Sequence, residues 1–286
     1  GAGWREAASS MGSAFQGSRA AGANARAEPN DGPQGQRERT RAEAPEPVDV
    51  AIVMALPIEA RPLLAKLREV RTYETPLLTI QEGLLGERLI AVALSGPGRA
   101  RAERAAQLMM EGHRPRWMIS AGFAGALNPA FRRGDVLIAQ EVVDPSDAAT
   151  VIEFQLGPEA AAQRFFAGRL VTVDEIVRTA KEKSALRFRT HADAVDMETS
   201  AVARLCQERF CRFFSVRVVS DDAHKDLPPE VLTILGPSGG FRVGATMGSL
   251  WRRPSCVMDL LELRESAHKA ADRLADVLAG LIAQLD

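Results

Sequence analysis

The sequence predicts an α/β fold in which a central, mixed and mostly parallel sheet carries helices on both faces. From residue 48 onward, short apolar segments of strand length alternate with amphipathic segments of helix length. The strand-like segments are apolar at nearly every position, which is typical of strands buried on both faces of a parallel sheet. No internal repeat interrupts this alternation. One three-layer domain therefore accounts for the folded part of the chain.

The individual elements follow in a regular order. Continuous apolar runs predict buried strands, and these cover residues 48–55, 87–94, 116–120, 134–143, 168–173 and 211–220. Helical periodicity predicts helices between and after them, over residues 58–70, 99–112, 197–210 and 258–285.

The N-terminal segment has a different composition. Residues 1–47 are rich in Ala, Gly, Arg, Glu, Pro and Gln, and Trp4, Met11 and Phe15 are their only large apolar residues. Such a segment cannot bury enough surface to offset the entropy lost on ordering. We therefore expect a disordered tail over residues 1–47 and a catalytic domain over residues 48–286.

Bulk properties exclude several classes of function. The formal net charge of −1 gives no electrostatic basis for binding nucleic acid or an anionic membrane. The three cysteines show no paired Cys or His spacing, which argues against a disulfide framework and a zinc site. No apolar run reaches the roughly 18 residues of a membrane span. We expect a cytoplasmic protein that uses no metal or cofactor.

Functional side chains are expected where the strands end, because parallel α/β sheets bind ligands at the carboxyl ends of their strands. Polar or glycine-rich segments occupy five such positions. They are Glu59, the loop 95–98 (SGPG), the segment 121–127 (AGFAGAL), the segment 196–199 (DMET) and the segment 217–222 (RVVSDD).

Taken one at a time, most of these features have an ordinary explanation. The 95–98 loop could cradle an anion at a helix N-terminus or be a tight turn, and the sequence leaves both open. Glu198 is stabilised by the start of its helix, which Asp196 could cap, and acidic residues after a strand are commonly turn formers. Arg217 is different, because a buried guanidinium inside an apolar strand must find a carboxylate or another acceptor, and the nearby acidic residues are its best candidates. The four histidines are expected to be structural or exposed.

Taken together, five ordered blocks resemble the nucleoside phosphorylase/nucleosidase superfamily, most closely its methylthioadenosine/adenosylhomocysteine nucleosidase branch. The blocks read AIVMALPIEARPLL, LSGPGRARAERAAQLM, ISAGFAGALNPAFRRGDVLIAQEVV, AVDMETSAVARLC and FFSVRVVSDDA. Residues 227–254 are also similar to hopanoid-associated phosphorylases, a sister branch that acts on a 5′-substituted adenine nucleoside. The resemblance implies a three-layer phosphorylase-like fold and cleavage of a purine nucleoside.

The resemblance also implies roles for three carboxylates. Asp221 aligns with the acid that protonates N7 of the departing purine, and Glu198 aligns with the carboxylate that binds the ribose hydroxyls as an oxocarbenium ion forms. Glu59 aligns with the base that activates water. This division resembles the two-carboxylate chemistry of O-glycoside cleavage.

The same resemblance implies a set of binding residues. Ser95 and Arg217 align with groups that position the water and the carboxylates, Met197 with a residue that packs on the sugar, and Ser220 with a residue that holds the aspartate. Ile176 and Val177 stand where the family places a base-stacking aromatic. The glycine-rich strand end adds Ala124 and Gly125.

Three functions remain open at this stage. Hydrolysis of a 5′-substituted adenine nucleoside is favoured, and phosphorolysis is the alternative, for which Arg61 is a candidate phosphate ligand although it falls inside a predicted helix. A catalytically dead nucleoside-binding relative is the third, because Phe123 and Ile176 depart from the family pattern. The resemblance further implies a homodimer, with residues 143–168 at the interface.

Overall fold

The computed structural model describes residues 47–75, 77–145, 150–153, 164–227 and 254–285, with side chains from residue 265 in the last range. Residues 1–46 of the expected tail and most of the 227–254 segment lie outside the described residues. The strands are β1 (Val50–Met54), β2 (Arg68–Glu74), β3 (Thr79–Leu85), β4 (Arg88–Leu94), β5 (Trp117–Ala126), β6 (Val136–Val143), β7 (Thr150–Val151), β8 (Phe165–Thr172), β9 (Ala194–Asp196) and β10 (Arg212–Asp221). The helices are α2 (Pro57–Leu64), α3 (Arg99–His113), α4 (Ala180–Thr190), α5 (Thr199–Glu208) and α8 (Pro254–Ile282).

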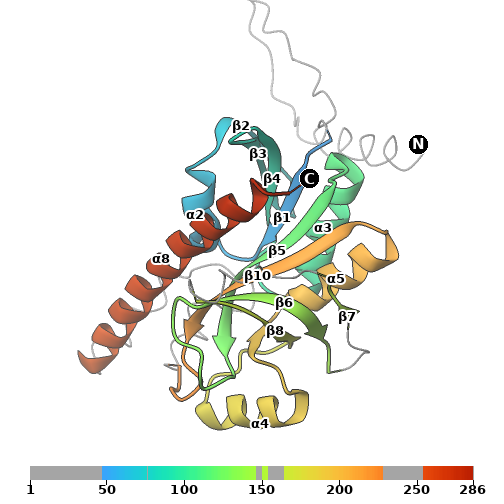
Figure 1. The fold of residues 1–286 in the computed structure, drawn as a ribbon. Coiled ribbons are helices and arrows are strands. Elements are labelled where there is room, and N and C mark those ends of the chain that lie inside the picture. Colours follow the sequence, from blue (N-terminus) through green and yellow to red (C-terminus); the bar gives the residue numbers. More distant parts are fainter. Residues whose placement is uncertain (1–46, 76, 146–149, 154–163, 228–253, 286) are drawn as a thin grey trace, which may run out of the picture. The chain divides into compact units, whose positions relative to one another are not determined.

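One mixed sheet organises these elements, as predicted (Figure 1). Strands β4, β1, β5 and β10 pair in parallel at its centre. Antiparallel pairing adds β3 and β2 beside β4. On the other side, the pairings β5–β10–β6–β8–β9–β5 form a closed ring of five strands. The ring brings the ends of β5, β9 and β10 together, although these segments are far apart in the sequence.

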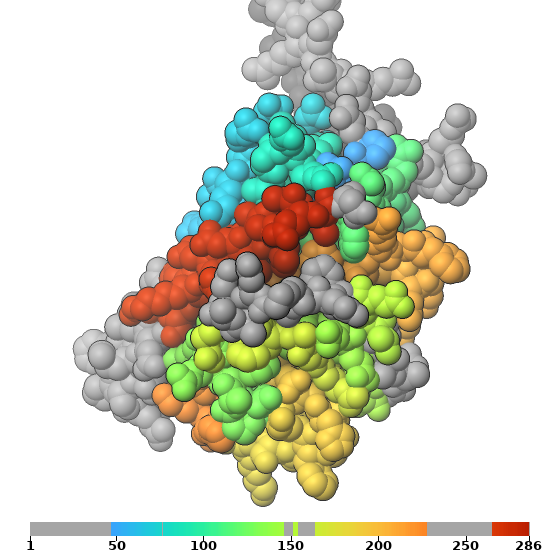
Figure 2. All heavy atoms as spheres, viewed as in Figure 1, coloured from blue at the N-terminus to red at the C-terminus, as the bar shows by residue number. Residues whose placement is uncertain are grey.

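Helices cover the sheet on both sides, so the layer prediction is confirmed. Alternate residues of β1 point to opposite faces: Ile52 belongs to one apolar core and Val53 to another. The first core includes Leu63 of α2 and Leu274 of α8, and the second includes Met109 of α3 and further residues of α5. Figure 2 shows α8 lying across one face of the domain.

The predicted helix 58–70 is wrong in its second half. Helix α2 ends at Leu64, and residues 68–74 form β2, which pairs with β3 in a hairpin that the sequence analysis missed. Strand β2 was overlooked because it is polar and largely exposed, so it lacks the apolar run of a buried strand. Gly86, with φ of +63°, makes the turn from β3 into β4.

Several boundaries also differ from the prediction. The strand predicted over residues 116–120 continues to Ala126, because the small residues of the following segment extend its pairing with β10. The helix predicted over residues 197–210 is shorter, with Glu198 as its N-cap residue. Helix α4 was not predicted, although Thr179 and Glu182 form a capping box at its start. None of the helices in the described part of the chain is long and apolar enough to cross a membrane.

Candidate active site

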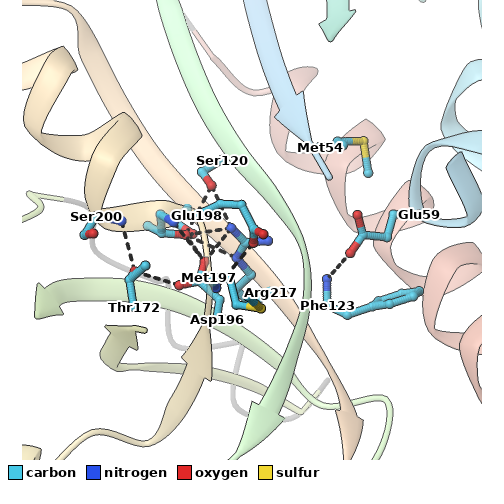
Figure 3. A network of polar contacts seen from close by, with 12 residues as sticks. Met54, Glu59, Ser120, Phe123, Thr172, Asp196, Met197, Glu198, Ser200 and Arg217 are labelled. Carbon is cyan, nitrogen blue, oxygen red and sulfur yellow. Dashed lines mark hydrogen bonds and ion pairs between the residues drawn. The ribbon is translucent and has the colours of Figure 1, made fainter. Parts of the chain in front are cut away.

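Arg217 lies in the middle of β10 and is the centre of a buried polar cluster (Figure 3). Only 1% of its surface is exposed. Its guanidinium lies 2.6 Å from Asp196 Oδ2 and donates hydrogen bonds of 2.7 Å to Thr199 Oγ1 and to Ser120 Oγ. Gly122 is its partner on β5, and a Cβ there would lie 2.5 Å from Arg217 Nη1. The prediction that Arg217 finds a carboxylate or another acceptor is confirmed, because it contacts one carboxylate and two hydroxyl groups, and glycine opposite it leaves the necessary space.

Asp196, at the end of β9, is the ion-pair partner of Arg217. Thr172 Oγ1 donates to its Oδ1 at 2.7 Å, and the backbone N–H of Thr199 donates to its Oδ2 at 3.0 Å. The Thr172 hydroxyl in turn accepts the backbone N–H of Ser200. The sequence analysis treated Asp196 only as a helix cap. Its second role, as counter-charge to a buried arginine, was predictable from the need of that arginine for a carboxylate.

Glu198 is buried beside this cluster, where it precedes the first residue of α5. Its Oε1 accepts the backbone N–H of Gly98 at 2.9 Å. Gly98 has φ of +101° and is the N-cap residue of α3. The 95–98 loop therefore does place an N–H group against an anion at a helix N-terminus, and that anion is a carboxylate of the chain itself.

Glu59, in the first turn of α2, reaches the same cluster from another element. Its Oε2 accepts the backbone N–H of Leu56 and its Oε1 accepts that of Phe123, both at 2.8 Å. A Cβ on Gly122 would lie 2.8 Å from Glu59 Oε1 as well as 2.5 Å from Arg217 Nη1. Glu59 and Arg217 thus approach the same glycine backbone, which brings them into one site.

The electrostatics of this half of the site are unbalanced toward negative charge. The pKa of Glu198 is raised to about 7, mainly by burial and also by the charge of Asp196, while Arg217 opposes the shift. Burial likewise raises the pKa of Glu59, against the opposing effects of the Phe123 N–H and of Arg217. Three buried carboxylates therefore lie near one guanidinium, and burial makes Glu59 and Glu198 hold protons more tightly than exposed glutamates do.

Asp221 lies four residues beyond Arg217 at the end of β10, about 13 Å further along an extended strand. Its Oδ1 accepts a 2.8 Å hydrogen bond from Ser220 Oγ, and its Oδ2 lies 2.6 Å from Lys183 Nζ. A Cβ on Gly125, its neighbour on β5, would lie 3.2 Å from Asp221 Oδ2. Lys183 was missed by the sequence analysis, because helix α4 itself was not predicted.

The remaining predicted residues lie at strand ends or on the segment before α4. Ser95 is buried at the end of β4, where its hydroxyl donates to the carbonyl oxygen of Gly96 at 2.7 Å. Met197 is half-buried between Asp196 and Glu198. Ala124 is buried and Gly125 half-buried on β5, beside the end of β10. Ile176 and Val177 are half-buried on the segment that leads to α4.

Two predictions concern residues outside the cluster. Arg61 lies in α2, as expected, and is exposed. Of the histidines, His113 is buried: its Nε2 lies 3.5 Å from Glu82 Oε2, and burial lowers its pKa to about 4. His113 is the last residue of α3, and its carbonyl oxygen accepts the backbone N–H of Val48, just before β1 begins. The His113–Glu82 pair therefore lies near the start of β1, whereas the candidate site lies at the other end of the strands. The other three histidines are exposed.

The fold agrees with comparisons to known proteins. The family model of the phosphorylase superfamily matches residues 49–162 and 145–234. The chain belongs to the phosphorylase superfamily.

Individual curated proteins and solved structures are also similar to this chain. The chain is 23% identical over 213 residues to the 5′-methylthioadenosine/S-adenosylhomocysteine nucleosidase of Baumannia cicadellinicola, covering 65% of this chain and 93% of the relative. It is 25% identical to that of Bacillus cereus, covering 62% and 87%. The crystal structure of the corresponding Campylobacter jejuni nucleosidase aligns with a TM-score of 0.65 at 21% identity, covering 83% of this chain and 100% of that one. Futalosine hydrolase of Helicobacter pylori aligns with a TM-score of 0.63 at 18% identity, covering 85% and 99%.

Proposed function

We propose that this chain hydrolyses the N-glycosidic bond of an adenine nucleoside with a 5′ substituent, such as 5′-methylthioadenosine or S-adenosylhomocysteine, and releases the free base. The similar curated proteins are nucleosidases named for these two substrates. The observation that carries the proposal is the burial of Glu59 and Glu198 beside Arg217, with Asp221 further along the same strand. Such a reaction recovers adenine and belongs to methionine salvage.

The unbalanced charge around Arg217 suits the proposed transition state. When the bond between C1′ and N9 breaks, positive charge develops on the ribose. Glu198 is our proposed ligand of the ribose hydroxyls, and its carboxylate stabilises that charge more strongly than it stabilises the neutral substrate. Met197, its half-buried neighbour, is the proposed contact of the sugar.

Glu59 is the proposed base that takes a proton from the attacking water. A raised pKa makes a carboxylate a stronger proton acceptor near neutral pH, and burial raises the pKa of Glu59. Arg217 and Ser95 are the proposed positioning groups for this water and the carboxylates. The oxygen of water bonds to C1′ while the C1′–N9 electron pair stays with the purine, and Asp221 delivers the proton that N7 gains.

Charge favours hydrolysis over phosphorolysis. A phosphate nucleophile would bring further negative charge to a site in which Glu59, Asp196 and Glu198 already share Arg217. Arg61 is exposed on α2, and Arg99, which follows the 95–98 loop, is paired with Asp144 and Asp174. Neutral water is therefore the better nucleophile for this site.

The test is direct. The purified protein is incubated with 5′-methylthioadenosine, S-adenosylhomocysteine or inosine, with and without inorganic phosphate, and the free base and the reducing sugar are measured. We expect adenine and reducing sugar without phosphate. Base release only in the presence of phosphate would show that the reaction is phosphorolysis. Substrate binding without any turnover would show that the chain is a catalytically inactive relative.

We further propose that residues 48–286 form the catalytic domain and that it acts as a homodimer in the cytoplasm. Val151, on β7 inside the region expected at the interface, is 67% exposed in the single chain. In a dimer that uses this region, the Val151 side chain would be covered by the second copy of the chain. Light scattering at micromolar protein concentration tests the dimer, and a strictly monomeric mass would contradict it.

A further inference from the structure

Lys183 is a buried lysine on a helix whose other side chains mostly face solvent. Only Lys183 and Leu186 of α4 are buried, and Lys183 has 0% of its surface exposed. Leu186 occupies the position expected for an inward-facing apolar residue. An ammonium group at the neighbouring inward position is costly to bury unless it is paired, so its partners indicate its purpose.

The Lys183 ammonium has three hydrogen-bond donors, and all three are used. They reach Asp221 Oδ2 at 2.6 Å, the carbonyl oxygen of Asp222 at 2.7 Å and the carbonyl oxygen of Lys225 at 3.1 Å. Asp221 is the one carboxylate among these partners. An ammonium and a carboxylate in this contact form a neutral buried pair, in which Asp221 carries its negative charge.

This pairing matters for the proposed reaction, because an ionised Asp221 has no proton to give. The departing purine nevertheless requires one at N7. Two groups donate hydrogen bonds to Asp221: the Lys183 ammonium to Oδ2 and the Ser220 hydroxyl to Oδ1. The ammonium is the more acidic of the two, so Lys183 is the candidate source of the proton.

We propose that Lys183 is a positioning residue that supplies Asp221 with the proton that the departing purine takes up; this inference rests on the proposed function. As the C1′–N9 bond breaks, its electron pair stays on the purine. Lys183 Nζ passes a proton to the Asp221 carboxylate, and the carboxyl group formed in this way passes a proton to N7. Lys183 is left as a neutral amine and regains a proton from water once the base has left.

A lysine that merely held the loop after β10 would act differently. It would affect every substrate equally, whatever the leaving group requires. The decisive comparison therefore uses two substrates with the same 5′ substituent: the adenine nucleoside, whose base must be protonated, and the 4-nitrophenyl riboside, whose phenolate leaves without a proton.

The variant is Lys183→Met, and the matched control is Lys181→Met, an exposed lysine on the same helix. We expect Lys183→Met to lower kcat for the adenine nucleoside by about 10²–10⁴-fold with little change in KM. Turnover of the nitrophenyl riboside should fall less than about tenfold under the same rule. Lys181→Met should match the wild type on both substrates. Equal losses on both substrates, or no loss, would overturn the inference.

A double variant keeps the test valid if Lys183→Met alone does not fold. Asp221→Asn with Lys183→Met removes both charges, and replacing a whole buried ion pair is tolerated far better than breaking it. If Lys183 acts through Asp221, adding Lys183→Met to Asp221→Asn should not lower kcat further. An additional loss would show a separate structural role. Wild-type protein that turns over neither substrate would instead refute the proposed function.

Discussion

Arg217 and Lys183, the two buried cations among the residues that the structure describes, are paired in opposite ways. Arg217 contacts Asp196, Thr199 and Ser120. Its positive charge also lowers the pKa of two nearby acids, Glu59 and Glu198, against the larger effect of burial. Lys183 instead faces one carboxylate and two backbone carbonyl oxygens. The first region holds three carboxyl groups around one cation, and the second holds one carboxylate beside one cation.

This difference matches the chemistry proposed for each region. An excess of carboxylates is suited to stabilising a cation that exists only in the transition state. A balanced pair is suited to moving a proton without creating an isolated buried charge. The predictions below test whether the two regions differ as their charges imply.

The largest effect is expected from Glu198→Gln in the Arg217 region. The substitution keeps the size of the side chain and removes the negative charge, so kcat should fall by at least about 10²–10⁴-fold, with a smaller effect on KM. Steady-state kinetics with 5′-methylthioadenosine measure both constants. If only KM changed, Glu198 would be a general binding residue.

Asp221→Asn should lower kcat by about 10²–10⁴-fold, because an amide cannot pass a proton to N7. Purine binding should persist, since the amide still forms hydrogen bonds. Substrate affinity measured separately by calorimetry distinguishes the two effects. A variant that lost binding and turnover together would indicate a structural role for Asp221.

The pH dependence should follow Glu198. The ionised form is the one we propose to be active, and the pKa of this group is raised to about 7, so kcat/KM should rise about tenfold per pH unit below pH 7 and level off above it. This limb should disappear in Glu198→Gln. An acidic limb retained unchanged in that variant would assign it to another group.

The same shift has the opposite sign for stability. Because the folded-state pKa of Glu198 is raised from 4.5, its contribution is fully present below pH 4.5 and is lost as the pH rises through about 7. Relative to Glu198→Gln, the free energy of unfolding of the wild type should fall by on the order of 3 kcal/mol across that window. Urea unfolding at pH 4.5 and pH 8.5 measures the difference.

The smallest effect is expected one residue beyond the proposed acid. The Asp222 carboxylate is partly exposed and lies 3.4 Å from Arg133 Nε, and its backbone carbonyl, not its side chain, contacts Lys183. Asp222→Asn should therefore leave kcat within about twofold of the wild type and change stability by less than about 1 kcal/mol. A large loss of turnover would show that the roles of Asp221 and Asp222 are exchanged.

The sequence predicted the layers and most central strands because buried strands have continuous apolar runs. It also placed Glu59, Glu198 and Arg217 at one site, through their positions at strand ends and the resemblance of their blocks to a family. It missed the β2–β3 hairpin, whose outer strand is polar, and it missed Lys183. Burial of a lysine on a largely polar helix depends on what packs against that helix, and local sequence does not record this.

The closed ring of strands described above also bears on self-association. A strand with unpaired backbone groups can recruit strands from other chains, whereas a ring pairs its strands with one another. At the other end of the strand order, β2 is the last strand, and it displays four charged side chains on an exposed surface: Arg68, Glu69, Arg71 and Glu74. Charged side chains on an edge strand oppose the docking of further strands. The polarity that concealed β2 from sequence analysis thus protects this edge of the sheet against aggregation.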